Sequence, residues 1–442
     1  MAKSQPEAPQ VQPFLTRIAV RGFKAHYAKT ELELRPLTIL AGANSSGKSS
    51  AMQALLLLKQ TIDALPLDVG PLKLGGPNVS FSDVKQFLAY EPAKGLAADF
   101  SITLDLSSAE SVELHFRPNR QTVELVDCTY QGKNASVRLT KGLNPTSSVD
   151  ALLKADNDPW KELLWTYSSA PPREETFEAQ RFASFLVLPA KFIPSSVEAI
   201  TAILQSFIHL SGHRGNPVRA YPRVVSGDKQ PGLFHERVAG VLAEWTETKD
   251  PRVAQLDEAL RRMGLTSRAT TTVLDANSLE IKVARTLQPA SAEDLVSVAD
   301  VGFGVSQSLP VVVALIAANP GQLVYIEQPE IHLHPRAQKA IADLIADAAR
   351  RGVRLVVETH SDIILSRLQW NIARKDQPLP PTDVIAHWFE RDPLTGVSRV
   401  RSNTPDETGA FGDWPVDFAD VAAEVDSEYS QAAFDRLPPD ES

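Results

Sequence analysis

Hydrophobic and polar positions in the first third of the chain follow a strand-like spacing. Short apolar or alternating runs predict strands at residues 15–20, 30–34 and 36–41. A leucine-rich stretch, residues 50–58, predicts a buried helix just after the third strand. Alternating runs between about residues 98 and 139 predict an antiparallel β lobe.

The pattern becomes helical further along the chain. Apolar spacing predicts helices within residues 148–207 and 232–263, and another that begins near Leu309. A fourth helix, residues 336–350, carries its apolar positions on one face. Short apolar strands precede and follow this helix, and such alternation of strands and helices is typical of an α/β fold.

One segment has a defined chemistry. Residues 42–49 read G-x-x-x-x-G-K-S between a predicted strand and a predicted helix, which is the context that a phosphate-binding loop requires. Glycines let backbone N–H groups approach phosphate oxygens, and the next helix adds unpaired donors at its N-terminus. Lys48 would reach the terminal phosphates, and the Ser49 hydroxyl would bind Mg²⁺. The predicted phosphate-binding residues are Gly42, Ala43, Asn44, Ser45, Ser46, Gly47, Lys48, Ser49 and Ser50.

Length and composition are those of a globular protein with a large core. The 442 residues are 43% hydrophobic and 22% charged. The single cysteine, Cys128, excludes an internal disulfide, and its alternating segment predicts a packed residue rather than a nucleophile. Apolar stretches are too short to span a bilayer, and residues 1–13 lack an apolar signal core. We therefore expect a cytoplasmic protein without a membrane partner.

A net charge of −9 provides no general basic surface for nucleic acid. Local clusters at Arg17, Arg21 and Lys24 and at residues 350–354 are more often solvated surface than binding sites. Charge therefore leaves DNA as a partner open.

Residues 209–221 invite a metal interpretation because His209 and His213 lie four positions apart. No carboxylate follows at ligand spacing, which disfavours a metal site. Arg214 and Arg219 are candidates for phosphate or partner contacts, or for purely structural roles.

Two strand ends in the second half are candidates for completing a nucleotide site. One strand ends in the run 327–330, and we expect it to lie beside the phosphate-loop strand, where a carboxylate holds Mg²⁺ or its water. The next strand ends at residues 359–361, which include His360. Upstream, Gly304 and Ser306 precede a predicted helix and form a second candidate phosphate seat.

Together these motifs resemble ABC-type ATPase heads, a group that includes the RecF, SMC and "overcoming lysogenization defect" (OLD) proteins. A closer similarity is to bacterial predicted ATPases with the phrases PLTILAGANSSGKSS, IEQPEIHLHPRAQ and ETHSDIIL and a C-terminal Trp-Pro segment, here residues 412–418. The resemblance implies an α/β fold: a P-loop ABC-type ATPase head with an antiparallel β lobe and a helical insertion. It divides the chain into a disordered tail (1–13), the N-terminal part of the ATPase core with the P-loop (14–90), the β lobe and helical insertion (91–290), the C-terminal part of the core (291–430) and a flexible tail (431–442).

The resemblance also implies roles for single residues. The P-loop would hold ATP with Mg²⁺, and Gly304 and Ser306 of a second copy would cap the γ-phosphate, so the protein would be a homodimer or a higher even oligomer. His360 would contact the γ-phosphate or the attacking water. The implied catalytic residues are Glu327, Gln328, Glu330 and His360, and the implied metal ligands are Ser49 and Glu327.

The acidic strand end departs from the pattern of this group. Such heads carry two adjacent acids, the first for Mg²⁺ and the second to polarise water, whereas Glu327 is followed here by Gln328. An amide cannot accept a proton as a general base, although it can orient water. Glu330 takes the role, or Gln328 positions water, or ATP mainly locks the dimer. We expect slow but real hydrolysis.

Regarding biological role, the resemblance implies a sensor or motor subunit in DNA-linked prokaryotic defence or repair. The residues after His360 contain no Asp-x-Asp on a predicted strand and no complete acid cluster, so we expect the chain to lack a nuclease of its own. A separate effector, a nuclease or a toxin, would dock on the insertion, residues 90–290. The alternative is a nucleotide-gated scaffold that binds ATP without useful turnover. A transporter engine is disfavoured by the long insertion and the missing membrane segments.

Overall fold

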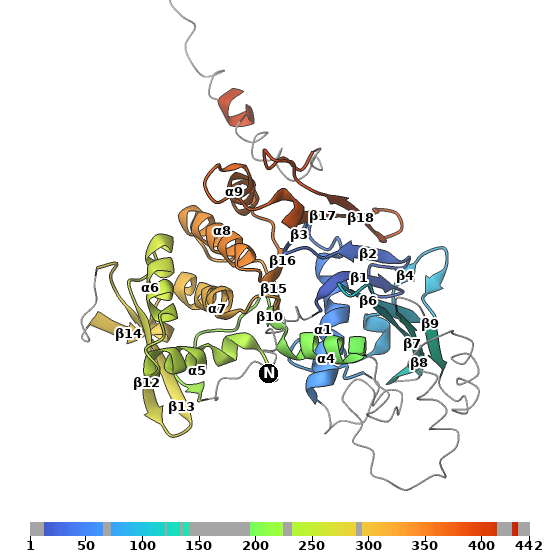
Figure 1. Cartoon of the computed structure of the whole chain (residues 1–442), viewed down its shortest axis with the longest axis horizontal. Coiled ribbons are helices and arrows are strands. Elements are labelled where there is room, and N and C mark those ends of the chain that lie inside the picture. Colours follow the sequence, from blue (N-terminus) through green and yellow to red (C-terminus); the bar gives the residue numbers. More distant parts are fainter. Residues whose placement is uncertain are drawn as a thin grey trace, which may run out of the picture.

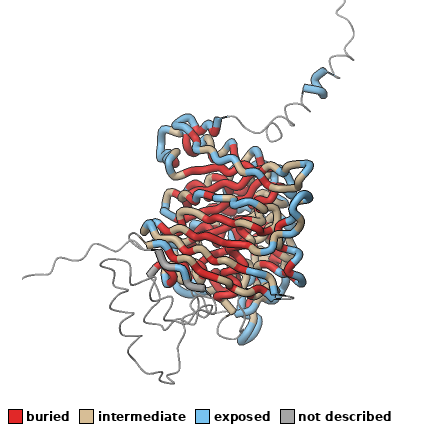
Figure 2. The backbone as a smooth tube through the Cα atoms, turned by 90° about the vertical axis from the view of Figure 1, so that its right-hand side faces the viewer, coloured by how far each residue is buried: buried red, intermediate tan, exposed pale blue. Residues whose placement is uncertain are grey.

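The computed structural model describes residues 13–64, 72–119, 122–132, 136–140, 195–223, 232–288, 294–412 and 427–431. Two six-stranded sheets and one four-stranded sheet organise these residues, and helices cover their faces (Figure 1). Buried backbone runs through the strands of the interior, whereas exposed backbone is confined to the rim (Figure 2).

The central sheet carries the phosphate loop. Its strands are β10 (Ile208–Leu210), β15 (Leu323–Glu327), β16 (Arg354–Glu358), β3 (Leu37–Gly42), β17 (Val384–Arg391) and β18 (Ser398–Asn403), in this spatial order. All neighbours are parallel except the β17–β18 hairpin. Every residue of β3 and β16 is buried, as parallel strands covered on both faces require.

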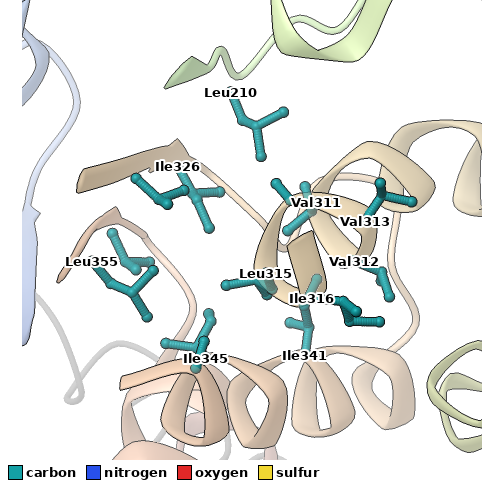
Figure 3. Close-up of a cluster of buried hydrophobic side chains, with 14 of the residues drawn as sticks. Leu210, Val311, Val312, Val313, Leu315, Ile316, Ile326, Ile341, Ile345 and Leu355 are labelled. Carbon is teal, nitrogen blue, oxygen red and sulfur yellow. The ribbon is translucent and has the colours of Figure 1, made fainter. Parts of the chain in front are cut away.

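One face of this sheet packs against a layer of helices. They are α5 (Phe234–Glu247), α6 (Arg252–Met263), α7 (Phe303–Ala317), α8 (Pro335–Arg350) and α9 (Asp362–Ala373). Figure 3 shows Leu315 of α7 between Ile326 of β15 and Ile345 of α8, and all three side chains are buried. Full burial of one such side chain contributes about 1.5–3 kcal/mol to the stability of the fold. Packing of this kind holds the helices against the sheet and so positions the strand ends that connect to them.

The other face packs against α1 (Lys48–Ala64), which lies between the central sheet and an antiparallel sheet. That second sheet contains β2 (Thr30–Glu33), β1 (Leu15–Arg21), β6 (Phe100–Leu106), β7 (Ser111–Asn119), β8 (Thr122–Gln131) and β9 (Ser136–Thr140), in this order. Leu40 and Tyr325 from the central sheet share one hydrophobic cluster with Leu55 of α1 and Phe100 of β6. Helix α4 (Ser195–Ser206) packs against α1.

A smaller sheet lies beyond the helical layer. It consists of β11 (Tyr221–Pro222), β13 (Ser278–Ala284) and β12 (Ala269–Asp275), with β14 (Leu295–Ser297) paired to β13. Helix α5 packs against β11, β12 and β13. The remaining short elements are β4 (Tyr90–Glu91), β5 (Gly95–Leu96) and the 3-10 turns η1 (Val84–Gln86), η5 (Val298–Asp300) and η6 (Pro381–Asp383).

The predicted fold class, an α/β P-loop core with an antiparallel β lobe and a helical insertion, is confirmed. Helices α5 and α6 occupy the segment 232–263, and α8 matches the predicted helix 336–350. The helix expected to begin near Leu309 begins earlier, at Phe303. Pro310 lies inside α7, beyond the first turn, where a proline is usually favoured.

Several predicted features lie outside the described residues. These are most of the helical pattern at 148–207, which is described only from residue 195, the Trp-Pro segment beyond residue 412, and nearly all of both tails. Cys128 is buried on β8, and burial raises the pKa of its thiol to about 12, as a packed cysteine requires. None of the described helices combines the length and the apolar character needed to cross a membrane.

Candidate nucleotide site

The predicted phosphate loop connects β3 to α1 and is shaped by two glycines. Gly42 and Gly47 have φ angles of +135° and +103°, which side chains rarely adopt. A Cβ atom at Gly42 would overlap the Phe389 carbonyl of β17, and one at Gly47 would overlap the Ser398 hydroxyl of β18. The β17–β18 hairpin therefore presses against the back of the loop, and only glycine fits at both positions.

His26 anchors the same loop from below. Its imidazole is fully buried, and its Nε2 lies 3.1 Å from the Gly47 carbonyl, while Nδ1 lies 3.1 Å from the Thr30 hydroxyl. Burial lowers the pKa of His26 to about 4. The ring is therefore neutral at pH 7, and it donates one hydrogen bond to the loop.

A cavity of about 630 Å³ opens over the loop. Seven consecutive loop residues line it, from Asn44 to Ser50, and Gln328, Glu358 and His360 reach it from other strand ends. Its size lies within the range of small-molecule sites, about 300–1,000 Å³. The structure therefore brings Gln328 and His360 together with the predicted phosphate-binding residues, whereas Glu327 and Glu330 do not line the cavity.

Lys48 is nearly buried beneath the loop. Its Nζ donates hydrogen bonds to the carbonyl oxygens of Gly42, at 3.0 Å, and Ala43, at 2.7 Å. Burial lowers the pKa of Lys48, and the nearby Glu358 carboxylate opposes this shift. The Lys48 ammonium group, which lines the cavity, is thus held by two carbonyl oxygens of its own loop.

The prediction that the strand ending at residue 327 lies beside the phosphate-loop strand is wrong. Strand β16 lies between β3 and β15, so Glu327, at the end of β15, is one strand removed from the loop. The acid beside the loop is Glu358, at the end of β16. The Ser49 hydroxyl lies 2.9 and 2.8 Å from its two carboxylate oxygens, and the Tyr325 phenol donates to Oε2 at 2.8 Å.

Glu327 is held by a different set of partners. The buried His209 ring donates from Nε2 to Glu327 Oε1 at 3.0 Å, and the Gly212 backbone N–H donates to Oε2 at 3.0 Å. Burial alone would raise the pKa of Glu327, but these hydrogen bonds and the His209 ring hold it below its usual value. The neighbouring Arg214 is buried and donates to the Glu327 carbonyl at 2.7 Å, which gives it a structural role at this turn.

The side chains of Glu330 and Gln328 differ in their hydrogen bonds and in whether they line the cavity. Glu330 accepts hydrogen bonds from the Thr359 hydroxyl at 2.9 Å and from the His360 backbone N–H at 2.7 Å, and burial raises its pKa. Gln328 has a φ of +44°, and its backbone N–H donates to the Glu358 carbonyl at 2.7 Å, which leaves its side chain at the cavity. Of the two candidates for positioning water, Gln328 is the one that lines the cavity.

The ring of His360 also lines the cavity. Its burial, and to a lesser degree the charge of Lys48, lowers its pKa. At neutral pH this imidazole is uncharged, so one ring nitrogen donates a hydrogen bond and the other accepts one.

Gly304 and Ser306 lie in the first turn of α7 and do not line the cavity of their own chain. Ser306 donates to the Phe303 carbonyl at 3.3 Å. Phe303 is 50% exposed, and its ring centroid lies 5.5 Å from that of His332, a residue in the left-handed region at φ +62°. This turn forms an exposed aromatic corner apart from the loop.

Sequence reasoning missed four side chains that shape the site: His26, His209, Tyr325 and Glu358. Glu358 ends a predicted strand, so the same strand-end rule that selected Glu327 also applies to it. Tyr325 lies two residues before Glu327 on a buried strand, where a phenol needs a hydrogen-bond partner. His209 was considered only as a metal ligand, and its partner Glu327 is distant in sequence, as is the Gly47 carbonyl that His26 contacts.

Comparison with known proteins identifies one matching family. Residues 37–366 match the family described as "AAA domain, putative AbiEii toxin, Type IV TA system". No curated protein matches the chain.

Solved structures that are similar to this chain include three heads of SMC proteins. One, the SMC head bound to the C-winged helix domain of ScpA, has 13% identity and a TM-score of 0.47 over 88% of this chain and 98% of that chain. The SMC head domain from Thermotoga maritima has 12% identity and a TM-score of 0.38 over 88% and 98%. An Smc head domain with an extended coiled coil, bound to the C-terminal domain of ScpA and derived from Pyrococcus furiosus, has 13% identity and a TM-score of 0.44 over 95% and 100%.

Proposed function

This chain belongs to the AAA domain family that matches residues 37–366, and on that premise we propose that it is a slow, Mg²⁺-dependent ATPase whose active sites form between two copies. One observation supports the proposal above all. The cavity over the phosphate loop joins Lys48 and Ser49 to Gln328 and His360, which come from two other strand ends. These residues are the parts that binding and slow hydrolysis of a nucleoside triphosphate need.

The residues of the cavity fit a nucleotide with its metal ion. Gly42 is required by close approach of the Phe389 backbone and Gly47 by its positive φ and the Ser398 side chain. The buried Ser46 hydroxyl has no hydrogen-bond partner within the described part of the chain. ATP would supply the phosphoanhydride bond, and the ion would neutralise charge on its phosphates. Loop N–H groups and the N-terminus of α1 would hold the phosphates, while Lys48 would turn from the carbonyls of Gly42 and Ala43 to a phosphate oxygen.

Slow turnover follows from the two residues that are candidates for positioning the attacking water, Gln328 and Glu330. Gln328 reaches the cavity, but its amide orients water without accepting the proton. Glu330 has a carboxylate, but it is committed to Thr359 and the His360 N–H. Without proton abstraction by a general base, hydrolysis loses a contribution of about 10²–10⁴-fold, so the reaction would depend on water positioning by Gln328, the charge of Lys48 and a hydrogen bond from His360.

Two copies are needed because the remaining phosphate seat lies elsewhere. Gly304 and Ser306 begin α7 and lie outside the cavity of their own chain. A second copy would bring this helix N-terminus against the γ-phosphate, where its unpaired N–H groups stabilise negative charge. Each dimer would then hold two ATP molecules at its seam.

We further propose a sensor or motor role in DNA-linked defence or repair, with a separate nuclease or toxin effector on the β lobe and insertion. Direct DNA contact through the basic clusters is disfavoured. Arg17 pairs with Glu31 and Asp105, and Arg21 pairs with Asp99. Arg354 is buried and donates to the Leu34 carbonyl. Recognition of DNA would therefore fall to the effector or to an assembled surface.

A nucleotide-gated scaffold is the second candidate. It is favoured by the amide of Gln328 at the cavity, which orients water but cannot accept its proton, because an ATP-locked dimer needs binding but no useful turnover. The two candidates differ in whether single-turnover hydrolysis occurs within the ATP-bound dimer.

The experiment is a complementation between two inactive variants. Lys48→Ala removes the phosphate contact, and Ser306→Arg blocks the seat contributed by the other copy, so each variant alone should lose turnover. A one-to-one mixture should regain it, because a mixed dimer contains one site with both elements intact. Ser107→Arg, a serine far from both elements, is the matched control and should behave as wild type. Two fully active single variants would refute the composite site.

A further inference from the structure

Gln328 adopts a backbone conformation that needs support from its surroundings. Its φ of +44° lies in the left-handed region, which residues other than glycine rarely adopt. Such a conformation persists only where the surrounding structure holds it in place. The Gln328 backbone N–H donates to the Glu358 carbonyl at 2.7 Å, and this bond holds one side of the turn. The contacts on the other side come from Arg214.

Arg214 lies between β10 and β11 and is 4% exposed. Its Nη2 donates to the carbonyl oxygens of Glu327, at 2.7 Å, and Gln328, at 3.3 Å. These carbonyls belong to the peptide groups before and after the Gln328 Cα atom. One guanidinium therefore fixes both peptide groups of the residue with the positive φ.

The guanidinium of Arg214 is itself anchored to α7. Its Nη1 donates to the Gln307 carbonyl at 3.4 Å, and the Gln307 side-chain amide donates to the Gly215 carbonyl at 2.7 Å. Gln307 directly follows Ser306 in the first turns of α7. Arg214 thus ties the Gln328 turn to the helix that carries the second candidate phosphate seat.

The charge and shape of Arg214 suit such a clamp. Burial lowers its pKa to about 10, and the carboxylates of Glu327 and Glu330 oppose this shift, so the guanidinium stays charged at neutral pH. Hydrogen bonds from a charged donor are about twice as strong as those between neutral groups. A guanidinium also presents its donors in a rigid fork, whereas a lysine ammonium is a point charge on a flexible stem.

The same segment also borders the side chain of Gln328. A Cβ atom at Gly212 would lie 3.3 Å from Gln328 Oε1, which is closer than most such contacts. The Gly212 N–H donates to Glu327 Oε2 at 3.0 Å and holds the segment at this place. Residues 212–214 therefore lie against both the amide and the backbone of Gln328.

From these contacts we infer that Arg214 is a positioning residue for ATP hydrolysis, which holds the Gln328 turn so that its amide is presented to the attacking water. The inference rests on the proposed role of Gln328 in the nucleotide cavity. Arg214 does not line that cavity, so it acts on turnover through Gln328 and leaves nucleotide binding unchanged.

The test is a double-mutant cycle between Arg214→Lys and Gln328→Glu, with turnover and affinity for a fluorescent ATP analogue measured for each protein. Gln328→Glu supplies a carboxylate that can accept a proton, so alone it should raise turnover about tenfold or more. Arg214→Lys keeps the charge but loses the fork, so turnover should fall about tenfold while affinity stays within about twofold. In the Arg214→Lys background the gain from Gln328→Glu should shrink to about twofold, because the carboxylate is no longer held toward the water.

Arg354→Lys is the matched control. Arg354 is also buried, and its guanidinium donates to the Leu34 carbonyl at 2.8 Å, at the opposite end of β16 from Glu358. This substitution should leave the gain from Gln328→Glu at its full size. Should Arg214→Lys fail to fold, Gln307→Met, which removes the hydrogen bond to the Gly215 carbonyl, must reduce that gain by a smaller factor.

Each outcome has a separate meaning. Wild-type turnover in Arg214→Lys would overturn the inference, and so would an equal gain from Gln328→Glu in both backgrounds, because Arg214 would then act independently of residue 328. A loss of analogue affinity as large as the loss of turnover would also overturn it, since Arg214 would then serve binding. Unchanged turnover in Gln328→Glu alone would reject the role of Gln328 and the inference with it. Absence of wild-type turnover above that of Lys48→Ala would reject the proposed ATPase itself.

Discussion

Protonation of His26 should weaken the folded state, because this ring is buried beneath the phosphate loop in its neutral form. Its ordinary pKa is 6.5, and burial lowers it to about 4 in the folded chain. The unfolded chain therefore binds a proton more readily in this interval. The contribution of neutral His26 is fully present above pH 6.5 and is lost as the pH falls toward about 4.

The size of the effect follows from the two pKa values. Full protonation costs about 3 kcal/mol, since each pH unit between 6.5 and about 4 contributes about 1.36 kcal/mol. At pH 5 the unfolded chain is almost fully protonated at this site and the folded chain is mostly unprotonated. The loss between pH 7.5 and pH 5 is then about 2 kcal/mol.

Urea unfolding at pH 7.5 and pH 5.0 measures this loss when wild type is compared with His26→Gln. Glutamine keeps a donor for the Gly47 carbonyl but does not titrate. The variant should be less stable at pH 7.5, yet its stability should fall by about 2 kcal/mol less than that of wild type on acidification. Other buried histidines contribute equally to both proteins and cancel in the comparison.

An equal pH dependence in the two proteins would refute this reasoning. It would mean that the His26 ring is protonated in the folded chain at pH 5.0 as readily as in the unfolded chain, so that an imidazolium donates the hydrogen bond to the Gly47 carbonyl.

Two further predictions concern residues with defined surroundings. Gly47→Ala places a side chain at a φ of +103° and against Ser398. We therefore expect the free energy of unfolding to fall by about 1–3 kcal/mol in urea or thermal unfolding, and ATP binding to be lost in calorimetry. The control Gly321→Ala, at a φ of +82° with open space around it, should strain the backbone but keep ATP binding. Cys128 should resist a thiol-reactive dye at pH 8 in the folded chain and react promptly in urea, because burial raises its pKa to about 12; prompt reaction without denaturant would contradict its burial.

The local parts of the site could be predicted from sequence. Strand β3, the loop and α1 are contiguous, so one motif with its apolar flanks defines all three. The predicted helix 336–350 also matches α8, because its apolar stripe is read within one segment.

The predictions that failed concern contacts between segments that are distant in the sequence. The sequence order β3, β15, β16 does not reveal that β16 is inserted between the other two, and this insertion places Glu358, not Glu327, beside Ser49. His26 and Tyr325 were missed for the same reason, since each acts through a partner whose position is set by strand pairing. The start of α7 at Phe303 rather than near Leu309 was missed as well, and Pro310 lies inside this helix.

The measurement that tests the central claim most directly is ATP turnover by the purified chain over a range of protein concentrations, with Lys48→Ala as the blank. A composite site predicts turnover per chain that rises with concentration, reaches a plateau when all chains are paired, and is absent from the variant. Turnover per chain that is constant from the most dilute sample onward, or that persists in Lys48→Ala, would contradict an ATPase built from this loop and a second copy.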